Sequence, residues 1–335
     1  LNIKLSDITC SIENDLNNFR TFFKETITSD VPLLDVLTKY LIKQKGKEVR
    51  PILVFLSARL FGNINKRSMV AATMIELLHT ATLLHDDVVD KAHSRRGFVT
   101  IHNIWNNKAG ILLGDFLLSK GLLIALENKE HTLLELQSRA VQKMSEGELR
   151  QLKTTGLFNM TEERYYRIIE EKTASLIATC CQCGAVSTSN DPEIHTKMYD
   201  VGKNIGMAFQ IKDDLLDYSE NEIGKPKRND IVERKVTLPF IMALQNAKKS
   251  EVRLYKKLMK KRKKKSSEVQ RIVDFVSANN GISHAKEVML DYASKAKNDL
   301  LEIAKPSSTK PLFQLIDFIT HLSLIHISEP TRQSL

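Results

Sequence analysis

The amino-acid sequence predicts an all-α protein, and three features support this fold class. Glycine and proline are scarce, with 13 and 8 among 335 residues, whereas usual frequencies are roughly 7% and 5%. Apolar side chains recur at intervals of three and four residues, which is the spacing of one helix face. No segment alternates apolar and polar residues as a half-buried strand does. With 42% hydrophobic residues, the chain can fill the core of one large helical domain.

The first helices are predicted over 14–28, 33–42 and 51–61, and the third of them begins at Pro51. Proline suits the first helical position because no partner exists there for an N–H group. Lys47 and Arg50 come just before this helix, where free backbone N–H groups favour an anion. The two cations are therefore candidates for an anion site, and ordinary loop charge is the alternative.

A helix over 68–90 carries three aspartates near its end, Asp86, Asp87 and Asp90. Asp86 and Asp90 lie one turn apart on the same helix face, where like charges repel. Ligands made only of oxygen suit Mg²⁺, which is held by one or two carboxylates together with substrate phosphates. The first triad therefore predicts a magnesium site, with an acidic helix end in solvent as the alternative.

The same spacing recurs at Asp213, Asp214 and Asp217, again after an apolar helical approach. Facing carboxylates from separate helices build metal sites in the cores of helical bundles. Six acids of this kind need a highly charged anion to bring the metal ions in, and a diphosphate fits this requirement. The repeat favours a functional site over a solvated helix end.

The remaining elements are also helical. Arg95 and Arg96 follow the first triad, and paired guanidinium groups suit phosphate oxygens. Lys172 and Thr173 lie within one of the later helices. Further helices are predicted over 111–126, 133–153, 165–187, 236–247, 269–278 and 283–304, with a last one from Pro311 and a break at Gly224-Lys225-Pro226.

The net charge of +10 is concentrated in one run. Eight cations without an acid among them form it: Lys256, Lys257, Lys260, Lys261, Arg262, Lys263, Lys264 and Lys265. The remaining charge of about +2 argues against a nucleic-acid-binding protein. We expect a solvated helix end or loop here, with an anionic membrane surface or nucleic acid as alternatives.

Compartment and anchoring follow from the same composition. No segment has the length and apolar character of a membrane span, and the first residues do not resemble a signal peptide. Three of the four cysteines, Cys180, Cys181 and Cys183, lack the spacing of a zinc site and are expected to be buried thiols. We expect a soluble, cytoplasmic protein.

Taken in order, the motifs resemble those of the trans-type polyprenyl diphosphate synthases, over about residues 30–320. Each motif is weak alone, but the ordered set is specific. The set comprises Gly46-Lys47-x-x-Arg50-Pro51, His79, the first triad, Arg95-Arg96-Gly97, Lys172-Thr173, Phe209-Gln210, the second triad and Gly224-Lys225-Pro226. The resemblance implies a helical bundle around a central cavity and a homodimer. It also implies repeated addition of isopentenyl diphosphate to an allylic diphosphate such as farnesyl or geranyl diphosphate.

The resemblance also implies roles for individual residues. The six aspartates would bind two or three Mg²⁺ ions, with Asp86, Asp90 and Asp213 as direct ligands. Arg95, Lys172 and Lys225 would hold the allylic diphosphate, and Thr173 and Gln210 would line the reaction centre. Lys47, Arg50, His79 and Arg96 would hold isopentenyl diphosphate.

Product length depends on residues upstream of the first triad. Ala81 and Thr82 precede Asp86 by about one helical turn, roughly 6–7 Å along the helix axis. Short-chain relatives commonly carry an aromatic side chain at this level, so Ala81 predicts an open passage and a long all-trans product. The alternatives are that Ala81 packs against a neighbouring helix and that the enzyme makes short chains. Release of a long product implies peripheral contact with a membrane.

Two stretches depart from the family pattern. Arg228 stands where relatives usually have glycine, and residues 322–335 resemble translated sequencing-adapter read-through, so we expect the domain to span 1–321. Three rival functions explain the motifs less well. A terpene cyclase normally mixes Asn, Ser or Thr into its second motif, a non-catalytic subunit of a two-component synthase would be expected to lose acids, and a nucleic-acid binder does not explain the triads.

Overall fold

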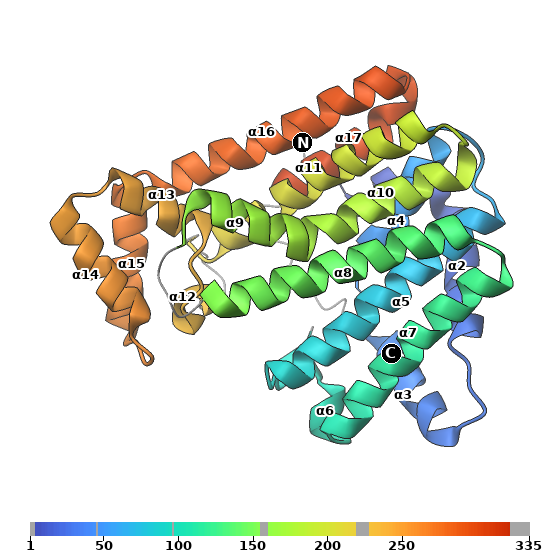
Figure 1. Ribbon diagram of the computed structural model, residues 1–335, viewed down its shortest axis with the longest axis horizontal. Coiled ribbons are helices and arrows are strands. Elements are labelled where there is room, and N and C mark those ends of the chain that lie inside the picture. Colours follow the sequence, from blue (N-terminus) through green and yellow to red (C-terminus); the bar gives the residue numbers. More distant parts are fainter. Residues whose placement is uncertain (1–3, 45, 96, 155–159, 219–227, 322–335) are drawn as a thin grey trace, which may run out of the picture.

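Long helices make up nearly all of the structure, a computed structural model that describes residues 4–44, 46–95, 97–154, 160–218 and 228–321 (Figure 1). The triads lie near the carboxyl ends of α5 (Lys66–Val89) and α11 (Pro192–Leu216). Between these helices lies α10 (Ser175–Thr188), which packs against both of them, against α4 (Val49–Arg59) and against α8 (His131–Thr154). The all-α prediction is confirmed.

The side chains of α10 explain its central position. They are mostly small, and nearly all of them are buried, including Ala178, Cys181 and Gly184. A helix that is buried on all sides lies in a core, and small residues let neighbouring helices approach closely. The three cysteines of α10 are free and buried, as predicted, and burial raises the pKa of the Cys181 thiol to about 12.

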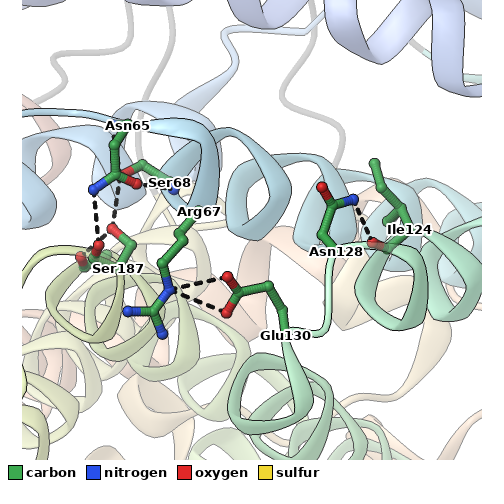
Figure 2. Close-up of polar contacts among 8 residues, drawn as sticks. Asn65, Arg67, Ser68, Ile124, Asn128, Glu130 and Ser187 are labelled. Atoms are coloured by element: carbon green, nitrogen blue, oxygen red, sulfur yellow. Dashed lines mark hydrogen bonds and ion pairs between the residues drawn. The ribbon is translucent and has the colours of Figure 1, made fainter.

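The amino-terminal end of α5 is fixed by polar contacts (Figure 2). Asn65 caps the helix by accepting a hydrogen bond from the Ser68 N–H at 3.2 Å, and its amide donates to the Ser187 carbonyl at 3.0 Å. The Ser68 and Ser187 hydroxyls are 2.7 Å apart. Arg67 donates to both oxygens of Glu130 at 3.0 and 3.1 Å. These contacts join α5 to α10 and to the start of α8, which fixes the helix that carries the first triad.

The remaining elements surround these helices. Before α5 lie α1 (Leu5–Thr9), η1 (Cys10–Ile12), α2 (Glu13–Thr26) and α3 (Pro32–Lys43). After it come β1 (Ser94–Arg95), β2 (Phe98–Val99), α6 (Ile101–Ile104) and α7 (Asn107–Glu127). Next are α9 (Glu162–Ile169) and the π-helical turn η2 (Glu170–Ala174). The carboxyl-terminal part holds α12 (Asn229–Glu233), α13 (Leu238–Asn246), α14 (Lys249–Lys260), α15 (Ser266–Ala278), α16 (Gly281–Ile303) and α17 (Pro306–His321).

Several boundaries differ from the predictions. The two-residue strands β1 and β2 pair antiparallel after the first triad, although no strand was predicted. The predicted helix 165–187 is interrupted by η2. Pro51 is the third residue of α4, and Pro311 lies inside α17 because that helix begins five residues earlier. Pro51 lies in the first helical turn, where an N–H group has no intrahelical partner to lose, whereas Pro311 is the sixth residue of α17 and removes one intrahelical hydrogen bond.

Two smaller apolar clusters flank the main core. One joins α13, α14 and α15 through Phe240, Met259 and Phe275, and Figure 1 shows α14 and α15 at the left end of the molecule. The other lies between α5 and α7 and contains Leu77, Ala81, Leu113 and Leu117.

Helix α7 departs from one expectation. Its mean hydropathy of 1.8 over 18 residues makes it long and apolar enough to cross a membrane by composition, although no such segment was predicted. Composition alone is weak evidence, since core helices pass the same test. One side of α7 packs against α5, where the ring of His85 comes so close that a side chain on Gly114 would clash with it. Other side chains of α7, including Leu112 and Leu123, are about half exposed.

Candidate active site

The three aspartates of the first triad lie in different environments. Asp87 is buried, and Arg95 donates a hydrogen bond to its carboxylate at 2.7 Å. Asp86 and Asp90 are exposed. A buried carboxylate needs such a partner, whereas the exposed pair is accessible to ions from solution. Asp86 and Asp90 therefore present their charge at the surface, and Asp87 fixes the hairpin that carries Arg95.

Charge crowds around Asp86. Loss of solvent on one side of this carboxylate is the main reason that the pKa of Asp86 is raised. Repulsion from Glu148 of α8, and to a smaller extent from Asp90, raises it further. Lys172 acts in the opposite direction. Its ammonium lies 2.5 Å from Glu148 and 3.0 Å from the Gln151 side-chain oxygen. Arg95 also acts to lower the pKa of Asp86, so a further cation there would relieve the repulsion that Lys172 and Arg95 leave in place.

In the second triad it is again the middle aspartate that is buried. Asp214 accepts hydrogen bonds from the Tyr165 hydroxyl at 2.6 Å and from the Gln210 amide at 3.0 Å, one on each carboxylate oxygen. Burial raises the pKa of Asp214 to about 7, although both hydrogen bonds lower it. Protein donors thus occupy Asp214, while Asp213 is exposed and Asp217 is half-buried.

A further acid, Asp230 of α12, joins this triad. Burial is the largest cause of the raised pKa of Asp213, and repulsion from Asp230 is the second. The same two causes raise the pKa of Asp217 to about 6. The Asp230 N–H donates to Asp217 at 2.6 Å. The Lys235 ammonium lies 3.3 Å from the Asp230 carboxylate. This cluster has an excess of negative charge beside a cation that can hold an anion.

A cavity of about 250 Å³ brings these groups together. Lys172, predicted to hold the allylic diphosphate, lines it with Thr173 and Gln210, predicted for the reaction centre, and with Asp213 and Asp214. Asp230, Arg234 and Lys235 also line it. The Thr173 hydroxyl donates to the Gln210 side-chain oxygen at 2.8 Å, and the Gln210 amide then donates to Asp214. Since Lys172 acts on the pKa of Asp86 and also lines this cavity, it lies between the two triads.

Two local features place Lys172 there. It belongs to the π-helical turn η2, and π turns inside α-helices occur frequently at functional sites. Gly147 of α8 faces this turn, and a Cβ at that position would lie 2.8 Å from the Glu171 Cβ and 2.9 Å from the backbone nitrogen of Lys172. Glycine is therefore required for the close approach of α8, which carries Glu148, to the turn that carries Lys172.

A second and larger cavity, of about 530 Å³, lies between α2, α3 and α5. Its lining includes His79, Asp87 and Arg95. It also includes Gly46 and Glu48 of the stretch 46–50, the predicted anion site before Pro51, which we call the anion loop. Lys47 and Arg50 of the same loop do not line it in the described structure. The Lys47 ammonium instead lies 5.5 Å from the centre of the Phe318 ring. Arg95, assigned to the allylic site by resemblance, lies with His79 in this cavity.

The donors suit magnesium. They are carboxylate oxygens, and the exposed ones, Asp86, Asp90 and Asp213, belong to both triads. Within the described residues, no three His, Cys, Asp or Glu side chains converge closely enough to hold a metal without other ligands. Mg²⁺ commonly binds one or two carboxylates and completes its shell with water and substrate phosphates. The residues therefore fit ions that share their ligands with a diphosphate.

Comparison with known proteins identifies the family. Residues 31–276 match the polyprenyl synthetase family. Heptaprenyl diphosphate synthase component 2 of Bacillus subtilis is 32% identical over 313 residues, which cover 92% of this chain and 88% of that protein. Octaprenyl diphosphate synthase of Escherichia coli is 36% identical over 243 residues, covering 72% of this chain and 74% of the relative. The chain belongs to the polyprenyl synthetase family.

Solved structures of polyprenyl synthetases agree with the described fold. A polyprenyl synthase from Caulobacter crescentus, crystallised with calcium and isoprenyl diphosphate, has a TM-score of 0.87 and 32% identity. The likeness covers 96% of this chain and 98% of that one. Family membership confirms the predicted enzyme class, a prenyltransferase, which transfers an alkyl group.

In this polyprenyl synthetase, Arg20 holds the predicted anion loop through Glu48. Its guanidinium donates to both oxygens of Glu48 at 2.6–3.2 Å. Glu48 has a φ of 52°, a left-handed conformation that is uncommon outside glycine. The bidentate pair offsets part of that conformational cost and fixes the backbone between Lys47 and Arg50.

Some predicted residues of this polyprenyl synthetase remain untested by the structure. Ala81 is fully buried and packs in the cluster between α5 and α7, while the Thr82 hydroxyl donates to the His79 carbonyl at 2.8 Å. Any passage for the product at this level would run along that cluster. Arg96, Lys225 and residues 322–335 lie outside the described residues.

Four functional candidates of this polyprenyl synthetase were missed in the sequence. They are Glu148, Tyr165, Asp230 and Lys235. Asp230 and Lys235 follow the second triad closely in sequence, so their position was a usable signal. Glu148 and Tyr165 reach the triads only because α8 and α9 pack beside η2 and α11, which no local pattern shows.

Proposed function

We propose that this polyprenyl synthetase is a Mg²⁺-dependent, long-chain trans-prenyltransferase that adds isopentenyl diphosphate repeatedly to an allylic diphosphate. The observation that carries the proposal is the arrangement of two acid triads around Lys172, beside a separate cavity that contains His79 and Arg95. The smaller cavity would take the allylic diphosphate with its metal ions. The larger one would take isopentenyl diphosphate.

The chemistry needs the allylic C–O bond to ionise. Negative charge then develops on the departing diphosphate, and positive charge develops on the allylic carbon. Lys172 and Lys235 stand where they stabilise the diphosphate, and bound Mg²⁺ adds Lewis-acid stabilisation of the same charge. Ile168, Ile169 and Val236 supply apolar walls of the same cavity, which keep water from the carbocation.

The second substrate then attacks. The double bond of isopentenyl diphosphate forms the new C–C bond, and the intermediate loses a proton, for which the released diphosphate is the nearest base. The Thr173 hydroxyl orients the Gln210 side chain, whose amide donates to Asp214, so this pair would hold the middle aspartate of the second triad in place during the reaction. The extended product becomes the allylic substrate of the next cycle.

Support for a long product comes from sequence and relatives. Ala81 leaves no aromatic side chain one turn before Asp86, and both named relatives are long-chain synthases, heptaprenyl and octaprenyl. A short-chain synthase remains the competing proposal for this site.

Helix α7 supports a homodimer. Its half-exposed leucines, among them Leu112, Leu122 and Leu126, form an apolar face that needs cover in a soluble enzyme. A second candidate assembly is heteromeric, because the Bacillus subtilis relative is named as component 2 of its synthase. We propose the homodimer, in the cytoplasm.

The experiment measures diphosphate release by the purified chain, with isopentenyl and farnesyl diphosphates as substrates, and its mass in solution by light scattering. Release that requires Mg²⁺ and both substrates, from a particle of twice the chain mass, supports the proposal. A folded dimer that releases nothing refutes the enzymatic proposal, while activity that appears only with a second protein refutes the homodimer.

A further inference from the structure

The basic run lies on a surface of its own. Residues 248–265 contain eleven Lys and Arg and one Glu, so this short segment carries a formal charge equal to that of the whole chain, +10. The run forms α14 and the turn that follows it, beside α15 at the left end of the molecule in Figure 1. The segment is thus one projecting cationic surface on an otherwise nearly neutral molecule.

Part of α14 is ordinary core. Met259 is fully buried, and the Tyr255 ring stacks on Phe275 with centres 3.9 Å apart. The exposed part is different. Lys249, Arg253, Lys257 and Lys260 are all exposed, and at about 100° per residue they fall within an arc of about 80°. We call these four residues the basic face.

The basic face has an electrostatic cost. Its members follow one another at intervals of four, four and three residues, where like charges destabilise a helix. In the described part of the chain, Lys249, Arg253 and Lys257 form no ion pair with an acid. Glu251 accepts a hydrogen bond from the Lys248 N–H, and Glu268 pairs with Lys261. The cost is relieved when an external surface supplies negative charge.

The turn after α14 extends the surface toward the active site. Arg262, Lys263 and Lys265 are exposed there. Lys264 lies close enough to Arg234 for that guanidinium to contribute to its lowered pKa, after loss of solvent. Arg234 lines the cavity of the second triad. The cationic surface therefore lies near Arg234, a residue that lines the proposed allylic site.

We propose that the basic face and the turn 261–265 dock on a membrane surface rich in anionic phospholipids. The partner choice rests on the proposed function, since a long polyprenyl chain dissolves in a bilayer and not in water. It also rests on Leu254, which is 47% exposed beside the basic face and can enter the headgroup region. The one aromatic side chain of α14, Tyr255, is engaged with Phe275, so the face offers no stacking platform for nucleic-acid bases.

The test uses the full chain without substrates. It is mixed with vesicles of phosphatidylcholine, alone or with about one third phosphatidylglycerol, at about 0.1 M salt, where charges act over about 10 Å. One cation near such a surface contributes roughly a fivefold gain in binding, corresponding to about 1 kcal/mol. Replacing the four residues of the basic face with Gln should lower co-sedimentation with anionic vesicles roughly 10²-fold or more.

A matched variant controls for net charge. Lys43, Lys66, Lys305 and Lys310 are exposed on other helices or connections, and their replacement with Gln removes the same charge. Both variants should keep the helical circular-dichroism spectrum and the turnover of detergent-dispersed substrates. The expected result is that only the basic-face variant loses vesicle binding and that about 0.5 M salt abolishes wild-type binding.

Other outcomes overturn the proposal. Equal loss in both variants would show a general charge effect, and binding to neutral vesicles would show an apolar one. Absence of vesicle binding together with tight binding of single-stranded RNA would make nucleic acid the partner. Vesicle binding is measured without catalysis, so it tests the docking proposal independently of product length. A short product would refute the long-chain proposal without changing the vesicle result.

Discussion

Tyr165 offers the sharpest test of how the second triad is held. Its buried hydroxyl donates to Asp214 at 2.6 Å, and the Tyr165→Phe substitution removes only that donor. A hydrogen bond to a charged group contributes roughly 1.5–3 kcal/mol, so metal-dependent diphosphate binding should weaken by about 10- to 100-fold. The hydroxyl also lowers the pKa of Asp214, which stands at about 7. Removal of the Tyr165 hydroxyl should therefore raise the pKa of Asp214. The pH range over which the rate rises should move to higher pH.

The assay has two readouts and a neighbouring control. Calorimetry measures the affinity for inorganic diphosphate as a function of Mg²⁺ concentration, without turnover, and initial rates are measured from about pH 5.5 to 9. Tyr166→Phe is the control, because the Tyr166 hydroxyl donates at 2.8 Å to Glu162, outside the triads. If Tyr165→Phe and Tyr166→Phe give the same affinities and the same pH profile, the hydrogen bond to Asp214 does not organise the site.

Three further predictions concern the triads, the anion loop and product length. Asp86→Ala and Asp213→Ala should each lower the turnover rate by roughly 10³-fold or more, since each removes a proposed metal ligand; near-native initial rates would refute the assignment. Arg20→Gln should raise the KM for isopentenyl diphosphate several-fold more than the KM for the allylic substrate, because it frees the Glu48 backbone. Arg139→Gln, which loses an exposed ion pair with Glu135, is the control. Equal shifts in both KM values would contradict a role of Arg20 in the isopentenyl site. Ala81→Phe should shorten the products while sparing the first condensation, as read by chromatography of the dephosphorylated alcohols, and an unchanged distribution from a folded enzyme would exclude a passage at Ala81.

Stability should also depend on pH through Asp214. Its folded pKa of about 7 lies above the value of about 3.9 expected in the unfolded chain. A raised folded pKa contributes stability below the unfolded value, and this contribution is lost as pH rises through the folded value. In Mg²⁺-free buffer, the free energy of unfolding should fall between about pH 4 and 7, by at most about 4 kcal/mol from this group. Urea titrations of wild type and Asp214→Asn test this, and an equal pH slope in both would contradict it.

The sequence was most informative where function depends on local spacing. The interval from Asp86 to Asp90, and its copy at Asp213 and Asp217, placed the outer acids of each triad one helical turn apart before any fold was known. Lys172 was expected to hold the allylic diphosphate, and Thr173 and Gln210 to line the reaction centre. One cavity holds all three together with Asp213 and Asp214. In each case the chemistry requires a charge pattern that a helix makes visible in the sequence.

What the sequence could not show depends on packing between distant elements. The hydrogen bond from Tyr165 to Asp214 joins α9 to α11, and the repulsion between Glu148 and Asp86 acts between α8 and α5. The π-helical turn at Lys172 leaves no periodic signal, because it adds one residue to an otherwise helical stretch. The basic run was expected to be a solvated helix end or loop, and it forms the end of α14 and the turn after it. The sequence did not show that Tyr255 and Met259, one turn apart, anchor α14 against α15.

The length of the product tests the central claim most directly. Purified protein would be incubated with labelled isopentenyl diphosphate, farnesyl diphosphate and Mg²⁺, and the dephosphorylated products would be separated by chain length. The account predicts a set of all-trans alcohols several isoprene units longer than geranylgeraniol, present in wild type and lost in Asp86→Ala. A folded wild-type enzyme that stops at geranylgeranyl diphosphate, or that forms no condensation product, would contradict it.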